Sequence, residues 1–136
     1  QHLELLNQQS DSDEFKSKLR TYSIILIDHL NWEIRDQYLE LLENYMEEKS
    51  GICNFRIRFC ERYESIEKVA DLLKSSRVLL SPDENSLDFG DLLSEIDNYC
   101  KVYSNDPEPF RNKFEIGDVE FRTSIEKIYL KIKILI

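Results

Sequence analysis

The stretch that decides the fold is "DVEFRTSIEKIYLKIKIL", Asp118 to Leu135. Its apolar residues recur every three or four positions, at Phe121, Ile125, Ile128, Ile132 and Leu135. This spacing is typical of one buried stripe on a helix. Acidic residues at its start and lysines at its end suit the helix dipole. We therefore expect a C-terminal helix that begins near Gly117 or Asp118.

The same spacing recurs toward the N-terminus. A fourth helix would present Phe89, Leu92, Leu93, Ile96, Cys100 and Tyr103. It would begin at "SPDE", where Ser81 can cap the helix and the proline takes the first helical position. A third helix would carry Ile52, Phe55, Phe59, Ile66, Val69, Ala70 and Leu73. These patterns predict two further amphipathic helices.

Two more helices are expected before Gly51. One begins at about Trp32 with Ile34, Tyr38, Leu41, Leu42, Tyr45 and Met46 on one face. Gly51 suits the left-handed position just past its end. The other is capped by Asp11 or Ser12 and carries Phe15, Leu19, Tyr22, Leu26 and Leu30. Within it, "SIILI" at Ser23–Ile27 is β-branched enough to read also as a short buried strand.

These elements predict an all-α protein. The 136 residues are 41% hydrophobic, which suits a single domain with a real core. Residues 1–10 form an expected flexible lead-in, and residues 11–136 form a single helical domain. Short connections favour an antiparallel four-helix bundle with an additional N-terminal helix. The run "IILI" is far too short to span a bilayer, so we expect no membrane association.

Negative charge is concentrated in one window. The net charge is −9, and residues 81–120 hold eleven acidic against three basic residues, which leaves −8 there. Such a field repels nucleic acid and attracts a basic partner, so no direct nucleic-acid binding is expected. A solvated acidic face that aids solubility is the alternative interpretation.

The residues offer little chemistry for catalysis. No phosphate-binding glycine loop and no nucleophile elbow occur. Cys53 and Cys60 are seven residues apart on the third helix, and we interpret them as buried thiols rather than a metal pair. Arg56, Arg58, Arg62, Lys68 and Lys74 alternate with acidic residues and are expected to pair within the helix. We expect no enzyme activity, no cofactor and no metal.

Part of the chain resembles the colicin D type of immunity proteins, small bacterial self-protection proteins. The residues that carry the likeness are "LLSEIDNYCKVYSNDPE" (92–108) and "NKFEIGDVEFRTSIEKIYLKIK" (112–133). The segment "YLELLENYMEEKSGICNFRIRFCERY" (38–63) resembles that family's opening helical hairpin. The likeness covers roughly 100 residues from about Ile34 onward. The first 30 residues are extra, and "CKVYSN" lengthens the family's turn.

The resemblance implies a four-helix antiparallel bundle that inhibits a toxin. Such proteins bind a nuclease domain that cuts tRNA, and acidic groups stand in for phosphates in its active site. Carried over, Asp97, Asp106 and Glu108 would contact the nuclease. Glu115, at the family's aromatic-Glu-Ile step, is a further candidate contact, and local capping or pairing before the helix is its alternative role. Tyr99, Tyr103 and Phe110 could anchor the interface, since tyrosine is common at hot spots.

The expected partner is therefore a basic protein, the nuclease domain of a toxin. The alternative is a helical structural or interaction subunit of a larger assembly that retains an immunity-like fold. We expect the bacterial cytoplasm for an immunity protein, and an organelle interior is possible for a subunit. The sequence leaves the oligomeric state open.

Overall fold

The computed structural model describes residues 21–73 and 83–136. Several predicted features lie outside these residues: the lead-in over residues 1–10, the helix start at Asp11 or Ser12, Phe15, Leu19, Lys74 and Ser81. The described residues form a helical segment over residues 21–33 and the helices α2 (Arg35–Met46), α3 (Ile52–Leu73), α4 (Glu84–Val102) and α5 (Asp118–Leu135). A short 3₁₀ turn, η2 (Glu108–Phe110), lies between α4 and α5.

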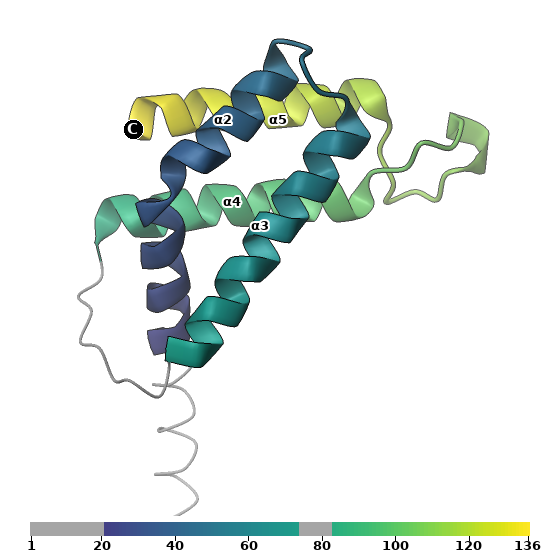
Figure 1. Cartoon of the computed structure of the whole chain (residues 1–136). Coiled ribbons are helices and arrows are strands. Elements are labelled where there is room, and N and C mark those ends of the chain that lie inside the picture. The colour runs from purple at the N-terminus through teal and green to yellow at the C-terminus, as the bar shows by residue number, and fades with distance from the viewer. Residues whose placement is uncertain (1–20, 74–82) are drawn as a thin grey trace, which may run out of the picture.

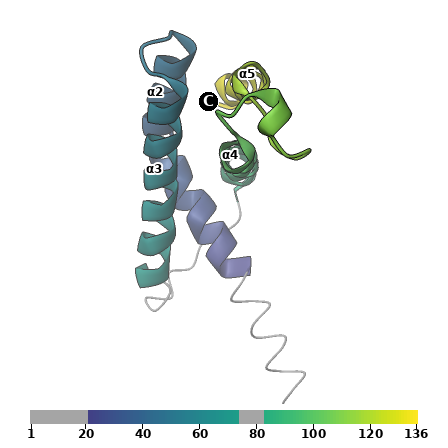
Figure 2. The same ribbon diagram turned by 90° about the vertical axis from the view of Figure 1, so that its right-hand side faces the viewer.

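The helices form two antiparallel hairpins that cross each other. Figure 1 shows α2–α3 lying across α4–α5, and Figure 2 shows the two hairpins as separate layers. This confirms the predicted all-α bundle with an additional helical segment at its N-terminal side. It also shows that "SIILI" is helical rather than a strand. Among the described residues, no helix is long and apolar enough to cross a membrane.

The core lies between the two hairpins, where the predicted stripes meet. The C-terminal stripe is buried at Phe121, Ile125, Ile128 and Ile132, and its last member, Leu135, is half-buried. The remaining core is mostly aromatic on α2 and α3, whereas α4 contributes two aliphatic residues, one phenylalanine and one cysteine. Its members are Tyr38, Leu42, Tyr45, Phe55, Phe59, Phe89, Leu93, Ile96 and Cys100. Burying these side chains is the main favourable contribution to folding.

The segment over residues 21–33 is joined to the bundle by aromatic and polar contacts. Trp32 packs edge-on against Phe89 with ring centroids 5.5 Å apart. Tyr38 Oη donates a hydrogen bond of 2.7 Å to Oδ1 of Asn31, and both side chains are buried. The segment ends at a turn at Ile34, so α2 begins later than predicted. The guanidinium of Arg35 stacks on Trp32 and donates to its carbonyl, which satisfies a group freed by the turn.

Two predicted helix ends are wrong in detail. The residue in the left-handed conformation after α2 is Glu48, with φ of 60°, and no described glycine has a positive φ. The amides of Lys49 and Ser50 both donate to the Asn44 carbonyl, so the helix closes before Gly51 is reached. At α4 the cap is Asp83 rather than Ser81, because Asp83 Oδ2 accepts the backbone N–H of Ser86 at 3.2 Å.

Two other expectations for α3 are also wrong. Cys53 is exposed and Cys60 is only half-buried, whereas Cys100 on α4 is the buried thiol. At about 100° per residue, both α3 cysteines fall well off the stripe that Phe55 and Phe59 define. The basic residues of α3 do not pair within the helix: in the described ranges, no ion pair joins Arg56, Arg58, Arg62 or Lys68 to a carboxylate.

Candidate partner-binding site

The connection between α4 and α5, residues 103–117, projects from the end of its hairpin (Figure 1). A parallel bridge between Tyr103 and Ile116 closes its base. Ser104 N donates to the Ile116 carbonyl, and Ile116 N donates to the Val102 carbonyl, each at 2.9 Å. The two ends of the connection are therefore held together, and what lies between them is presented as one loop.

Hydrogen bonds within the loop fix its shape. Asp106 N donates to Ser104 Oγ at 3.1 Å, and Arg111 Nε donates to the Asp106 carbonyl at 2.7 Å. Asn112 Oδ1 accepts the backbone N–H groups of Phe114 and Glu115. In return, Glu115 Oε1 accepts the N–H of Asn112 at 2.9 Å. A loop ordered in this way loses little conformational freedom when it binds.

An open cleft of about 620 Å³ lies between this loop and the start of α5. Four acidic residues line it: Asp106, Glu108, Asp118 and Glu120. Arg111 is the one basic residue of its lining, and in the described part of the chain it forms no ion pair with these carboxylates. We call these five residues and the space between them the acidic cleft. Its formal charge is −3, so it presents a local negative field.

Tyr103 and Asp118 connect the acidic cleft to the bundle. Tyr103 Oη donates to Asp118 Oδ1 at 2.6 Å, and partial burial together with the Asp118 carboxylate raises the pKa of Tyr103 to about 12. The Arg56 guanidinium lies over the Tyr103 ring, 4.7 Å from the ring centroid. The same guanidinium donates from Nη2 and Nε to the Cys100 carbonyl, at 2.7 and 3.1 Å. The last turn of α4 is thereby tied to α3.

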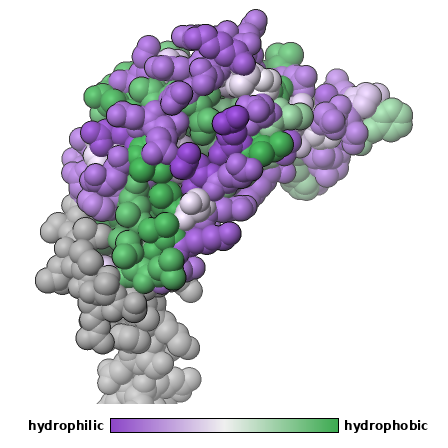
Figure 3. Space-filling model, in the orientation of Figure 1, coloured by the Kyte–Doolittle hydropathy of each residue, from purple (hydrophilic) through white to green (hydrophobic). Residues whose placement is uncertain are grey.

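Exposed apolar side chains lie close to the acidic cleft in the chain. Phe110 is 77% exposed, Phe114 is 71% exposed and Val119 is 82% exposed. Figure 3 shows hydrophobic surface at the tip of the projecting loop, beyond a hydrophilic region. Lone exposed apolar residues are common on protein surfaces. Several of them on one ordered, charged projection are typical of a protein-binding surface.

The structure brings together only part of the predicted site. Asp106 and Glu108 line the acidic cleft, Phe110 is exposed beside them, and Tyr103 supports Asp118. Glu115 is half-buried and engaged in the loop. Sequence reasoning missed Asp118, Glu120 and Arg111 as cleft residues, because Asp118 and Glu120 were interpreted as first-turn acids of a helix. The available signal in the sequence was that Asp118 and Glu120 directly follow a long acidic connection, which places them next to its carboxylates.

Asp97 and Tyr99 lie away from the acidic cleft. The Asp97 side chain is 16% exposed and forms a 2.8 Å ion pair with Lys101, one turn further along α4. On α3, burial is the main cause of the raised pKa values of Cys60 and Tyr63, and the negative charge of Asp97 is the second cause. Tyr99 is half-buried against the core. Tyr99 therefore packs against the core, and Asp97 is paired along α4.

Within residues 21–73 and 83–136, no three acidic, histidine or cysteine side chains come together as a metal site. Comparison of the chain with protein-family models, with curated proteins and with solved structures finds no match.

Proposed function

We propose that this chain is an inhibitor that binds a basic nuclease domain through the acidic cleft and so blocks RNA cleavage. The observation that carries the proposal is the convergence of Asp106, Glu108, Asp118 and Glu120 on one cleft beside exposed aromatic side chains. A nuclease cleft must hold a polyanion and is lined by positive charge. Carboxylates fixed on a helical frame can take the positions of phosphates in such a cleft.

The order of the loop supports inhibition by a preformed surface. The Tyr103 hydrogen bond holds the Asp118 carboxylate, and the bridge at the loop base holds the backbone of the loop that carries Asp106 and Glu108. Binding then requires little rearrangement, and opposite fields speed the encounter. Phe110 and Phe114 would supply apolar contact area, which charge alone does not give.

The nuclease as partner comes from the resemblance to colicin D type immunity proteins, which supplies the class of target. The acidic cleft supplies the chemistry that such a target would recognise. Asp97 and Tyr99 are left out of the proposed contact because neither lines the acidic cleft: Asp97 pairs with Lys101, and Tyr99 packs against the core. The proposed contact residues are Asp106, Glu108, Phe110, Asp118 and Glu120, with Tyr103 and Glu115 holding the loop in place.

A second candidate function is a structural subunit that docks through the outer side of α4 and α5. An open hollow of about 550 Å³ lies there, with Leu92, Ile134 and Leu135 among its apolar lining. Asp88, Asp91 and Glu95 line the same hollow, and Lys131 is its one basic residue. A basic, amphipathic surface of a neighbouring subunit would match this arrangement.

Identifying the natural partner distinguishes between the inhibitor and the structural subunit. The tagged chain is expressed in its source cells and the bound proteins are identified by mass spectrometry. If the chain is an inhibitor, one basic nuclease domain should be recovered with it. The purified chain, added at one molecule per nuclease domain, should then stop tRNA cleavage. Recovery of a multi-subunit assembly without nuclease activity, or a nuclease that stays active when bound, would contradict the inhibitor function.

A further inference from the structure

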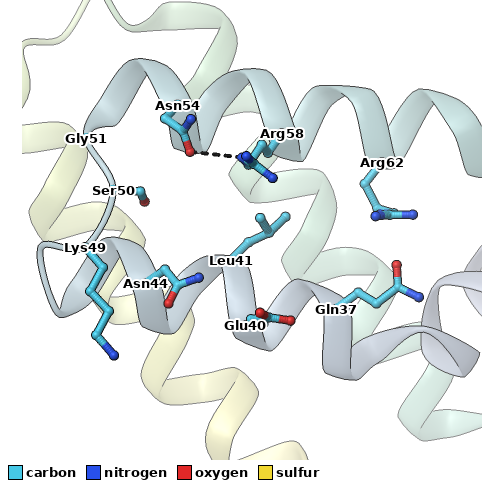
Figure 4. Close-up of a pocket in the computed structure, with 10 residues that line it drawn as sticks. All are labelled: Gln37, Glu40, Leu41, Asn44, Lys49, Ser50, Gly51, Asn54, Arg58 and Arg62. Atoms are coloured by element: carbon cyan, nitrogen blue, oxygen red, sulfur yellow. Dashed lines mark hydrogen bonds between the residues drawn. The ribbon is translucent and has the colours of Figure 1, made fainter.

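A polar groove of about 740 Å³ lies between α2 and α3. Arg58 and Arg62 line it from α3, and Figure 4 shows Arg62 extending toward α2, with Leu41 between the two helices. Gln37, Glu40 and Asn44 line the groove from α2, and Asn54 lines it from α3 beside Arg58. We call this space the arginine groove. It shares none of its lining with the acidic cleft.

The two arginines have carboxylates near them but, within the described residues, form no close ion pair: Glu40 lines the groove from α2, and Glu61 lines an adjoining hollow with both arginines. Over the described ranges, neither Arg58 nor Arg62 has a carboxylate oxygen within the 4.0 Å of an ion pair. Arg58 Nε donates a 3.1 Å hydrogen bond to Asn54 Oδ1, which orients the guanidinium and leaves its two terminal nitrogens available. The arginines are four residues apart on one helix face, so they also repel each other. A bound anion would relieve that repulsion.

The groove favours one kind of anion. A guanidinium is a planar fork that donates two parallel hydrogen bonds to phosphate oxygens. The carboxamides of Gln37 and Asn44 offer donors and acceptors across from it. The volume falls within the range of small-molecule sites, roughly 300–1,000 Å³. Glu40 is the acidic residue of the lining, so it opposes an anion from the α2 side.

We propose that the arginine groove binds a small phosphorylated compound. Arg58 and Arg62 hold its phosphate groups, and the carboxamides of α2 bind its remaining polar groups. In a chain of net charge −9 this site depends on the local pair of arginines rather than on the overall field. The proposal is independent of the nuclease-inhibitor function, because it rests on the other hairpin of the bundle.

The test is calorimetric titration of the full chain with inorganic pyrophosphate and, separately, with ATP at fixed ionic strength. The arginine variant is Arg58→Gln with Arg62→Gln. Its charge-matched control is Lys68→Gln with Lys127→Gln, two exposed lysines outside the groove lining. A charged hydrogen bond contributes enough that the arginine variant should bind at least about tenfold more weakly than wild type. The control should stay within about twofold.

A third variant gives an effect of opposite sign. Glu40→Gln removes the opposing carboxylate and should tighten binding of both probes by a few fold. Because residues 40, 58 and 62 are not in the buried core, unfolding midpoints of all variants should match wild type without ligand. The proposal is overturned if neither probe binds the wild type, or if the lysine control loses as much affinity as the arginine variant.

Discussion

The carboxylate of Asp28 lies directly against the Cα of Gly90, in the space that a side chain at position 90 would need. The contact joins the helical segment over residues 21–33 to the middle of α4. Gly90 is buried, and Asp28 is half-buried over it. This position of the Asp28 side chain therefore depends on the absence of a Cβ at residue 90.

Gly90→Ala should destabilise the protein. Helix propensity alone predicts a gain of about 1 kcal/mol for this change. Overpacking against Asp28 should outweigh that gain and leave a net loss of about 1–2 kcal/mol. Urea unfolding measures the difference. Gly51→Ala is the matched control, because nothing lies within 4 Å of its Cβ position and the free energy should stay within about 0.5 kcal/mol. A stabilised Gly90→Ala variant would show that the close contact is not maintained.

Asp28 should make stability decrease as the pH rises. Burial, and then the neighbouring Asp91, raise its pKa from 3.8 to about 6. A raised carboxyl pKa favours the folded state fully below pH 3.8, and this contribution is lost as the pH rises through 6. After allowance for solvent screening, the loss is of the order of 1–2 kcal/mol.

The measurement for Asp28 is the free energy of unfolding of wild type and Asp28→Asn across this pH range. Subtracting the two curves removes the contribution of the other acidic residues. The Asn variant should be more stable than wild type above pH 6, and the advantage should shrink toward pH 4. A difference that does not change with pH would contradict the raised pKa.

Glu48→Gly should stabilise the turn between α2 and α3. Glu48 has φ of 60°, a conformation that costs an L-residue about 1 kcal/mol and glycine almost nothing. It also places a negative charge near the negative end of the α2 dipole. We expect a gain of about 0.5–1 kcal/mol, measured by urea unfolding. Glu47→Gly, one residue earlier and at negative φ, should not stabilise. If both changes have the same effect, the left-handed turn is not the cause.

Arg56→Lys should loosen the α4–α5 loop although it conserves charge. Lysine cannot reproduce the two hydrogen bonds to the Cys100 carbonyl or the planar contact with Tyr103. We expect a loss of about 1–3 kcal/mol and faster amide exchange at Ser104 and Ile116, whose N–H groups close the loop base. Arg58→Lys, on the same helix, should leave exchange at these two amides unchanged.

Periodicity in the sequence predicted the helices and most of their buried residues. The stripe Phe121, Ile125, Ile128 and Ile132 is buried as expected, because spacing along one helix fixes which side is apolar. The crossing of the hairpins could not be predicted in the same way, since it depends on how side chains of different helices interlock. The Gly90 contact follows from that crossing and has no signal in the sequence.

Charged residues were harder to predict than apolar ones. Sequence spacing suggested that Arg58 and Arg62 pair with acidic residues within α3, yet Arg58 donates to Asn54 and both arginines line the groove between α3 and α2. The ion pair between Asp97 and Lys101, one turn apart on α4, was likewise not predicted. Long charged side chains have several partners within reach, and exposed ion pairs differ little in energy. Tertiary structure therefore decides which charges remain available at a surface.

The most direct test of the central claim is the association rate between the chain and the basic nuclease domain recovered with it. Asp106→Lys with Glu108→Lys reverses two carboxylates of the acidic cleft, and Glu64→Lys with Glu67→Lys reverses two exposed carboxylates on α3 as a charge-matched control. The account predicts that the cleft variant associates at least about tenfold more slowly at low salt and that the control changes by about twofold or less. Equal slowing of both variants, or a cleft variant that still associates and inhibits like wild type, would contradict it.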